Sequence, residues 1–219
     1  MASYLPSLPD FAAFLRQHNA SDFEEVLEPI INDLPRLCER LQKPSPKIAI
    51  DSHGIFVRKA TVSKLPSIFN HLVRNSLDHG LESAGDRAQS GKSTSGSIAI
   101  ELQQGIKYHM LSYRDDGGGL DLKKILEKSR ELGLNESRTV IEGMRKVFTT
   151  RLSTKDRVSD ISGRGIGLDA VNDLVKSLNG RIDLHLLEAG IEEDAPINTG
   201  TSRKLAFEFV KLLPRELFL

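Results

Sequence analysis

The sequence contains no tryptophan, and aromatic residues make up only 5% of its 219 residues. So few rings provide little material for a stacking surface that binds single-stranded nucleic acid. Lys and Arg together number 30, as do Asp and Glu, so the chain carries no net charge. This balance argues against a nucleic-acid groove and against a polybasic membrane anchor. We therefore expect no nucleic acid among the partners of this chain.

Cysteine and long apolar runs are also scarce. The one cysteine, Cys38, excludes an internal disulfide framework and fits a reducing compartment, where it would serve as a small apolar residue of a helix. No run approaches the roughly 20 apolar residues that a membrane-spanning helix needs. The N-terminus lacks the charged start and apolar stretch of a signal peptide. These absences predict a cytoplasmic chain with no direct membrane insertion.

The chain is long enough to bury one sizeable core and to carry an appendage. Residues 1–43 are predicted to be an N-terminal helical segment, because apolar residues recur at helical spacing from about residue 10 to residue 42. Ser21 is the expected N-cap within this segment, and Pro29 and Pro35 are expected to kink or divide its second helix. Residues 44–219 are predicted to form the main domain.

Short strands and helices are interleaved along the main domain. Strands are expected at 47–50, 97–103, 107–114, 181–187 and 204–212, and helices at about 65–80, 122–132, 137–147 and 168–178. A loop rich in Gly and Ser is expected at 82–97. Two hairpins with helices predict an α/β (α+β) two-layer sandwich, with a mixed, largely antiparallel sheet and helices on one face. A Rossmann fold would require strands and helices that alternate throughout.

The helix predicted to end near Gly80 carries an unusual polar stripe. His71, Asn75, Asp78 and His79 recur at helical spacing beside an apolar stripe of the same helix. A solvated helix face normally carries Lys and Glu. Imidazoles, an amide and a carboxylate instead coordinate metals, position water and pass protons. On this segment alone, an ordinary surface stripe remains an equal alternative.

Two glycine-rich stretches follow further along the chain. Asp115-x-Gly117-x-Gly119 comes directly after a predicted strand, and its glycines would let a flat ring lie against the backbone. The carboxylate could accept a hydrogen bond from an exocyclic amine such as that of adenine, although a simple turn is the common alternative. In the stretch 162–168, three glycines alternate directly before a helix. Free backbone N–H groups and a helix N-terminus form an anion site there, with a plain hinge as the alternative.

Together, the stretches 71–80, 115–119 and 153–169 resemble the N, G1 and G2 boxes of the GHKL ATPase superfamily. They are most similar to the ATP-binding catalytic domain of chemotaxis-type (CheA-like) histidine kinases, whose first box has the same His and Asp-His-Gly. The resemblance covers about residues 25–212 and implies the Bergerat (GHKL) ATPase fold with a lid at 148–166. It also implies an ATP-dependent histidine protein kinase of a two-component phosphorelay, with ATP and Mg²⁺ at its site.

The resemblance further implies a role for each matching residue. Asn75 is expected to be the magnesium ligand, and His71 the residue that activates or positions the attacking group; both are therefore catalytic. Asp115 would bind the adenine amine. The other expected contributors to nucleotide binding are Asp78, His79, Gly117, Gly119, Ser153, Thr154, Lys155, Gly163, Arg164, Gly165, Gly167, Leu168 and Thr201.

Two of the departures from the family pattern bear on function. The lid reads Phe148-Thr-Thr-Arg-Leu-Ser153-Thr154, where the family commonly has Phe-x-Pro-Gly-Phe-Ser-Thr. The chain also has no obvious phosphoacceptor helix, so it is expected to be either a fragment of a larger kinase or a stand-alone module. A catalytically weak nucleotide-binding interaction module is therefore an alternative. The gyrase, heat-shock chaperone and mismatch-repair branches are disfavoured, because they carry an acidic residue at the position of His71.

Expected partners follow from the same resemblance. A histidine-containing phosphotransfer domain or protein would accept the phosphoryl group, and a response regulator would receive it indirectly. The N-terminal helices resemble the end of the dimerisation segment of the family, so a homodimer through them is an open expectation.

Overall fold

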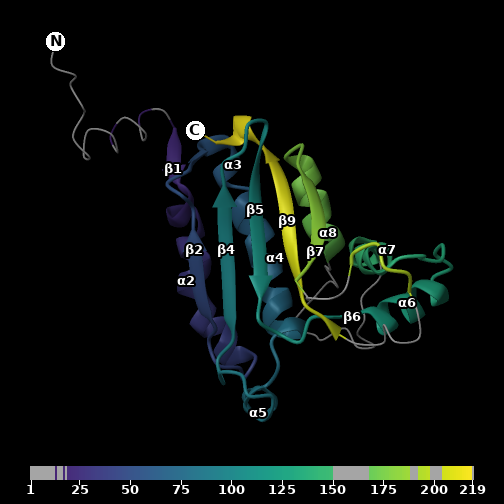
Figure 1. Cartoon of the computed structure of the whole chain (residues 1–219). Helices are drawn as coiled ribbons and strands as arrows, with labels where there is room; N and C mark the ends of the chain where they lie inside the picture. Colours follow the sequence, from purple (N-terminus) through teal and green to yellow (C-terminus); the bar gives the residue numbers. More distant parts are fainter. Residues whose placement is uncertain are drawn as a thin grey trace.

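A five-stranded sheet forms the centre of the molecule (Figure 1). The computed structural model describes residues 13, 17, 19–149, 168–187, 192–197 and 204–218. Across the sheet the order is β2 (Lys47–Asp51), β4 (Ser97–Gln103), β5 (Tyr108–Asp115), β9 (Phe207–Pro214) and β7 (Arg181–Leu186). β2 runs parallel to β4, and the other neighbouring strands are antiparallel. The mixed, largely antiparallel sheet is therefore confirmed.

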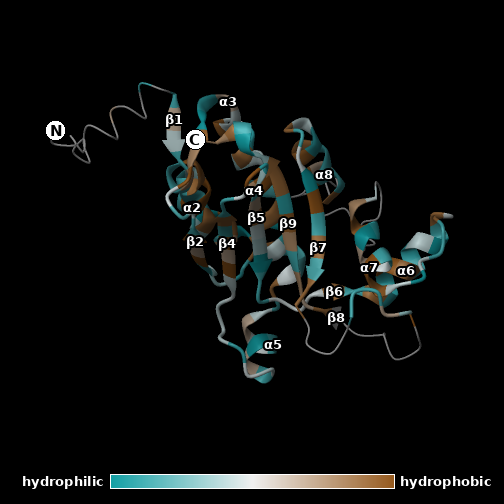
Figure 2. Cartoon of the chain, turned by 45° about the horizontal axis from the view of Figure 1, so that its top comes forward, coloured by the Kyte–Doolittle hydropathy of each residue, from teal (hydrophilic) through white to brown (hydrophobic). Residues whose placement is uncertain are grey.

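Two rows of buried side chains cross the inner face of this sheet. One row contains Ile100, Tyr113, Phe209 and Leu184, and the next contains Leu102, Leu111, Lys211 and Ile182. These residues share a face because side chains alternate along a strand. In Figure 2, hydrophobic and hydrophilic bands alternate along β7 and β9, the pattern of strands with one buried face. One lysine thus lies in a row that is otherwise apolar.

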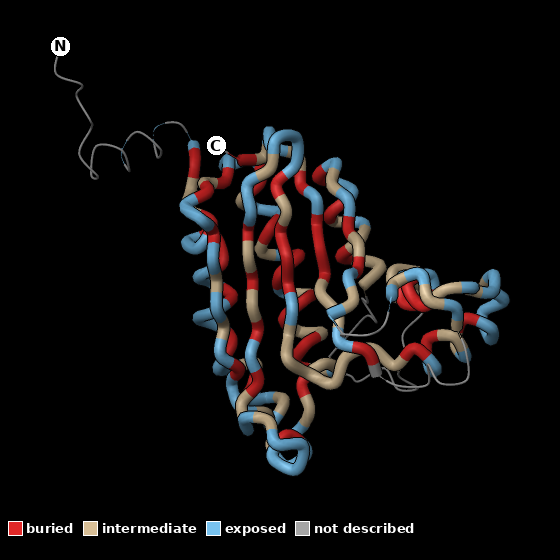
Figure 3. The backbone as a smooth tube through the Cα atoms, viewed as in Figure 1, coloured by how far each residue is buried: buried red, intermediate tan, exposed pale blue. Residues whose placement is uncertain are grey.

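Helices α2 (Phe23–Arg40), α4 (Leu65–Asn75) and α8 (Leu168–Ser177) lie on one face of the sheet (Figures 1 and 3). Each turns an apolar stripe with three-and-four spacing toward the core. The ring of Phe23 on α2 meets that of Phe69 on α4 edge-on, with centroids 5.9 Å apart. Cys38 is buried in the stripe of α2, as expected of a small apolar residue. The two-layer sandwich with helices on one face is confirmed.

The N-terminal helix differs from expectation in two respects. α2 continues through Pro29 and Pro35, which both lie on its exposed side, so the predicted division is wrong. Burial of its apolar face outweighs the backbone hydrogen bonds that two prolines remove. The N-cap is Asp22, whose carboxylate accepts a hydrogen bond from Glu24 N at 2.7 Å. Ser21 instead belongs to β1 (Ala20–Asp22), which pairs with β3 (Phe56–Arg58).

The stretch predicted to be a loop at 82–97 contains α5 (Ala84–Gln89). Ser83 caps this helix by accepting a hydrogen bond from Asp86 N at 3.2 Å. Arg87 of the same helix is only 1% exposed and makes ion pairs described below. Local composition favours a loop here, and these tertiary ion pairs hold a short helix instead.

The remaining elements are short. They are α3 (Lys59–Val62), η1 (Ser76–Gly80), β6 (Leu120–Asp121), α6 (Leu122–Glu131), α7 (Val140–Arg145), η2 (Lys146–Phe148), β8 (Lys204–Leu205) and η5 (Arg215–Leu217). α7 begins later than its predicted start at 137 because Thr139 and Glu142 form a capping box. β6 pairs with β8 beside the main sheet.

Across the described ranges, no helix is long and apolar enough to cross a membrane. The division of the chain at residue 43 stays a prediction, and α2 shares one hydrophobic core with α4. Of the predicted lid, only residues 148 and 149 belong to the described part of the chain.

Candidate active site

The polar stripe of α4 ends in a local change of helix type. After Asn75 the chain continues as the π-helix η1, in which Leu81 N donates to Ser76 O at 2.7 Å. Single π-turns within α-helices are frequent at functional sites because they redirect side chains. This one ends at Gly80, against the end of β5.

Asp115, the last residue of β5, is fixed by two hydrogen bonds. Its Oδ2 accepts from Ser76 Oγ at 2.5 Å, and its Oδ1 accepts from Gly117 N at 3.0 Å. A Cβ at Gly80 would lie 2.8 Å from Oδ2, and one at Gly117 would lie 2.2 Å from Gly80 O. Glycine is therefore required at both positions for the carboxylate and the two backbones to approach this closely.

Gly119 connects this turn to the small β6–β8 sheet. Its φ is +74°, and an added Cβ would lie 2.3 Å from Leu205 O. Close backbone packing thus requires glycine at both Gly117 and Gly119. Their part in lining a base pocket stays a prediction.

The turn after Asp115 is anchored by a buried arginine that the sequence did not single out. Arg87 Nη2 lies 2.8 Å from Asp116 Oδ2, and Arg87 Nη1 lies 3.0 Å from Glu82 Oε2. Lys92 Nζ lies 2.8 Å from Glu82 Oε1 and also donates to the carbonyl of Gly117 at 3.0 Å. Lys92 Nζ also donates to the backbone carbonyl of Asp116 at 2.9 Å.

The acidic members of this network are held in their charged forms. Burial alone would raise the pKa of the Asp116 carboxyl, but hydrogen bonds from Ser97 N and the Arg87 guanidinium hold that pKa below its ordinary value. Burial likewise opposes ionisation of Glu82, while Lys92 and Arg87 hold its pKa low. The network therefore consists of charged partners and fixes the backbone that follows Asp115.

The polar stripe leads to this turn, because it ends at His79, next to Gly80 and its close approach to Asp115. Asp78 pairs with Arg74 one turn earlier, with Oδ2 and Nε 3.5 Å apart. Burial, followed by the positive charge of Arg74, lowers the pKa of His71, so its imidazole is neutral at pH 7. The amide Nδ2 of Asn75 is buried and has no hydrogen-bond partner among the described residues. His79 is exposed.

The start of α8 lies at this end as well. β7 begins with Arg181 opposite Leu212, near the far end of β9. The preceding helix α8 therefore ends there and begins toward the end of the sheet at which β5 ends (Figure 1). Leu168 is its first residue, as predicted. The other predicted site residues lie outside the described ranges: Ser153, Thr154, Lys155, Gly163, Arg164, Gly165, Gly167 and Thr201.

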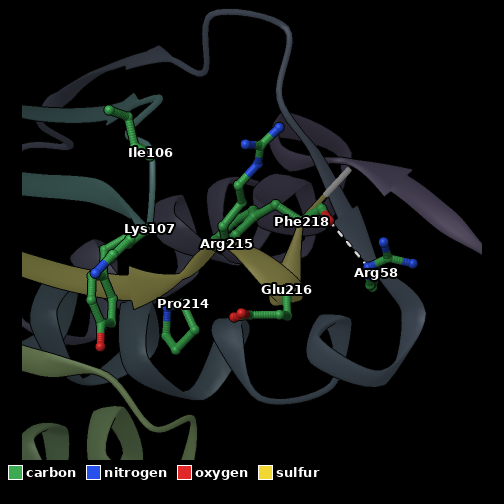
Figure 4. Close-up of a pocket in the computed structure, with 8 residues that line it drawn as sticks. Arg58, Ile106, Lys107, Pro214, Arg215, Glu216 and Phe218 are labelled. Carbon is green, nitrogen blue, oxygen red and sulfur yellow. Dashed lines mark hydrogen bonds between the residues drawn. The ribbon is translucent and has the colours of Figure 1, made fainter.

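A separate cavity of about 690 Å³ lies at the opposite end of the sheet (Figure 4). Its lining includes Arg58, Lys107, Arg215, Ile106 and Phe218. Arg58 Nε donates to Phe218 O at 3.1 Å. No residue predicted to bind nucleotide lines this cavity.

Comparison with known proteins identifies the class. Residues 61–213 match the model of the histidine kinase-, DNA gyrase B- and HSP90-like ATPase family. This match covers more than half of the chain and includes Asn75, Asp115 and the start of α8. The chain belongs to this family, and the expected GHKL assignment is confirmed.

Among curated proteins, the chain is similar to chemotaxis protein CheA. It is 35% identical to CheA of Bacillus subtilis over 170 residues, which cover 74% of this chain and 25% of that protein. It is 29% identical to CheA of Salmonella typhimurium over 181 residues, covering 77% and 27% respectively. The chain thus spans about a quarter of the length of these relatives. The nucleotide-free catalytic domain of histidine kinase ThkA has the same fold, with a TM-score of 0.50 and 14% identity over 89% of this chain and 93% of that one.

Proposed function

We propose that this chain is the Mg-ATP-binding catalytic domain of a CheA-like histidine kinase. It transfers the γ-phosphoryl group of ATP to a histidine on a separate phosphotransfer domain or protein, from which a response regulator receives it. One observation carries the proposal: the Asp115 carboxylate is fixed at a strand end, in a turn where glycine backbones approach it closely. Family membership and similarity to CheA proteins support it.

Asp115 recognises the base in this proposal. An ionised carboxylate only accepts hydrogen bonds, and its two oxygens have about four acceptor positions. Two are used by Ser76 and Gly117, which leaves acceptor capacity for the exocyclic amine of adenine. Gly117 and Gly119 leave room for the flat ring, and Thr201 assists Asp115.

Asn75 suits a magnesium ion bound together with phosphates. Mg²⁺ usually keeps several waters and is held by one or two protein oxygens plus substrate phosphates. Asn75 offers one such oxygen, and phosphates and waters would complete the shell. The oxygen of Asn75 would hold the ion, and its unpaired Nδ2 would donate to phosphate. Bound Mg²⁺ supplies neutralisation of the charge on the transferring group.

The remaining predicted residues position and screen the phosphates. The neutral imidazole of His71 has a free lone pair, with which it orients the attacking histidine or takes its proton. The start of α8 at Leu168, with Gly163, Gly165 and Gly167 before it, presents N–H groups to the phosphates. Asp78, His79, Ser153, Thr154, Lys155 and Arg164 complete the phosphate side of the site.

Phosphoryl transfer in trans tests this proposal. The chain would be incubated with γ-labelled ATP, Mg²⁺ and a separately produced histidine-containing phosphotransfer domain. We expect label on a histidine of that domain, and we expect Asn75→Ala to reduce the rate by about 100-fold or more, which matches the loss of about 3 kcal/mol of charge stabilisation. Asn70→Ala is the matched control, because Asn70 is exposed on the same helix.

The outcomes separate the two candidate functions. Label that appears equally with wild type and Asn75→Ala would contradict the role of Asn75. Binding of ATP by the wild type without any labelling would favour the catalytically weak interaction module. The altered lid sequence is the observation that suggests this alternative. A homodimer through the N-terminal helices stays a prediction, which the sedimentation velocity of the same preparation would test.

A further inference from the structure

Two consecutive hydrogen bonds connect the protein core to the Asp115 carboxylate. Tyr113 OH lies 2.8 Å from Ser76 Oγ, and Ser76 Oγ lies 2.5 Å from Asp115 Oδ2. Tyr113 is 1% exposed and Ser76 is 3% exposed, so water does not compete with either hydroxyl. The sequence patterns did not single out these two residues. They come from different elements, η1 and the inner face of β5.

The donor and acceptor of each of these two hydrogen bonds follow from the hydrogens that are available. Asp115 as a carboxylate has no hydrogen to donate, so the one hydroxyl hydrogen of Ser76 points to Oδ2. The lone pairs of Ser76 are then its only means of binding Tyr113, which must be the donor. Burial raises the pKa of the Tyr113 phenol, and Asp115 adds to this rise, so the phenol keeps its hydrogen throughout the working pH range. Donation thus runs one way, from Tyr113 to Ser76 to Asp115.

This one-way donation controls what Asp115 can recognise. A short hydroxyl-to-carboxylate bond of 2.5 Å is charge-assisted and holds Oδ2 in the acceptor state. Gly117 N holds Oδ1 in the same state. The free acceptor positions then attract a donor such as a purine 6-amino group. A purine with a carbonyl oxygen at position 6 would place acceptor against acceptor, which leaves both groups unsatisfied.

We propose that Ser76 and Tyr113 are positioning residues that make the Asp115 site selective for a 6-aminopurine nucleotide over a 6-oxopurine nucleotide. This inference rests on the proposed function, because it needs a nucleotide at Asp115. Without the Ser76 hydroxyl, the carboxylate is free to turn away from the base, and a water molecule can bridge it to a carbonyl oxygen. The site would then accept both kinds of base.

Competition binding tests the inference. ATP and inosine triphosphate differ at position 6 of the base, and each would compete with a fluorescent ATP analogue for the intact chain with Mg²⁺. We expect Ser76→Ala to lower the ratio of the inosine triphosphate Kd to the ATP Kd by about tenfold or more, since one hydrogen bond to a charged group is lost. Tyr113→Phe removes only the hydroxyl that donates to Ser76, so we expect the same Kd ratio to fall by about threefold. Ser76→Thr keeps the hydroxyl and should restore the wild-type ratio.

Matched controls separate selectivity from general damage. Ser129→Ala removes another buried serine, whose Oγ donates to Ile125 O at 2.7 Å on α6, away from the site. Tyr108→Phe removes an exposed phenol at the other end of β5. Neither should change the Kd ratio, even if each lowers stability.

Each outcome is decisive. An unchanged ratio in Ser76→Ala, with ATP still bound, would overturn the inference. If Ser76→Ala fails to fold by circular dichroism, Tyr113→Phe decides, and an unchanged ratio there would overturn it equally. Failure of the wild type to bind either nucleotide would instead refute the proposed function itself.

Discussion

Lys211 gives the sharpest stability prediction, because its ammonium lies in the core. Its side chain is 0% exposed, and its Nζ has no hydrogen-bond partner among the described residues. The rings of Phe69, Tyr113 and Phe209 surround it, with centroids 5.6 to 5.9 Å from Nζ. Replacing this lysine by methionine keeps the length of the side chain in a row of buried apolar residues and removes the amine.

The magnitude follows from the cost of burying the charge. Burial lowers the pKa of Lys211 from 10.5 to about 7, and the Glu208 carboxylate offsets this only in part. At 1.36 kcal/mol per pH unit, that difference corresponds to about 5 kcal/mol. The three rings favour the charged form and return up to about 2 kcal/mol, but they supply no hydrogen bond to the three N–H groups. We therefore expect Lys211→Met to raise the free energy of unfolding by about 3–5 kcal/mol below pH 7.

The stability that Lys211→Met gains over wild type should decrease as the pH rises. The folded-state pKa lies below that of the unfolded chain, so the unfolded chain binds more protons between pH 7 and 10.5. Wild-type stability from this group therefore rises with pH across that window, and the advantage of methionine shrinks. Urea unfolding followed by circular dichroism at several pH values from 6 to 10 would measure the difference between the two proteins. Lys107→Met, at an exposed lysine, is the control. A difference that is independent of pH, or a methionine variant less stable than wild type, would refute the reasoning.

Three further changes test other parts of the structure. Arg87→Met should cost about 3–5 kcal/mol in urea unfolding, because it leaves two carboxylates without their buried partner; a cost below 1 kcal/mol would contradict the anchoring role. Gly119→Ala should cost about 2–4 kcal/mol and weaken ATP binding, whereas Gly133→Ala, with a similar φ but open space around it, should cost about 1 kcal/mol. Burial is the main cause of the low pKa of His71, and the positive charge of Arg74 is the second. Arg74→Gln removes that charge, so the pKa of His71 should rise. The acid limb of the pH–rate profile for phosphoryl transfer should then move to higher pH. An unmoved limb would exclude His71 as the titrating group.

The sequence predicted the sheet and its covering helices well because their apolar periods are regular. The hairpin of β4 and β5 and the ends of α8 lie within one or two residues of expectation. α5 was missed because its stability comes from Arg87, whose partners lie 5 and 29 residues away in the chain. α2 continues through its prolines because tertiary burial overrides a local preference.

Local patterns predicted parts of the site and missed others for a similar reason. Asp115 and its glycines form a contiguous signature, so the sequence alone could single them out. Ser76 and Tyr113 meet only because η1 and β5 meet, and their separation of 37 residues gives no local signal. Lys211 follows the alternation of β9 as if it were apolar, and only the register with β5 reveals that it is buried.

The most direct measurement is a calorimetric titration of the chain with ATP, with and without Mg²⁺. Asp115→Asn would be compared with wild type, and Asp51→Asn, at an exposed aspartate that ends β2, would be the matched control. We expect Mg²⁺-dependent binding by wild type and control, and at least about 30-fold weaker binding by Asp115→Asn, since a charge-assisted hydrogen bond to the base is lost. Equal affinity of Asp115→Asn and wild type, or no binding by wild type, would contradict the assignment of the ATP site.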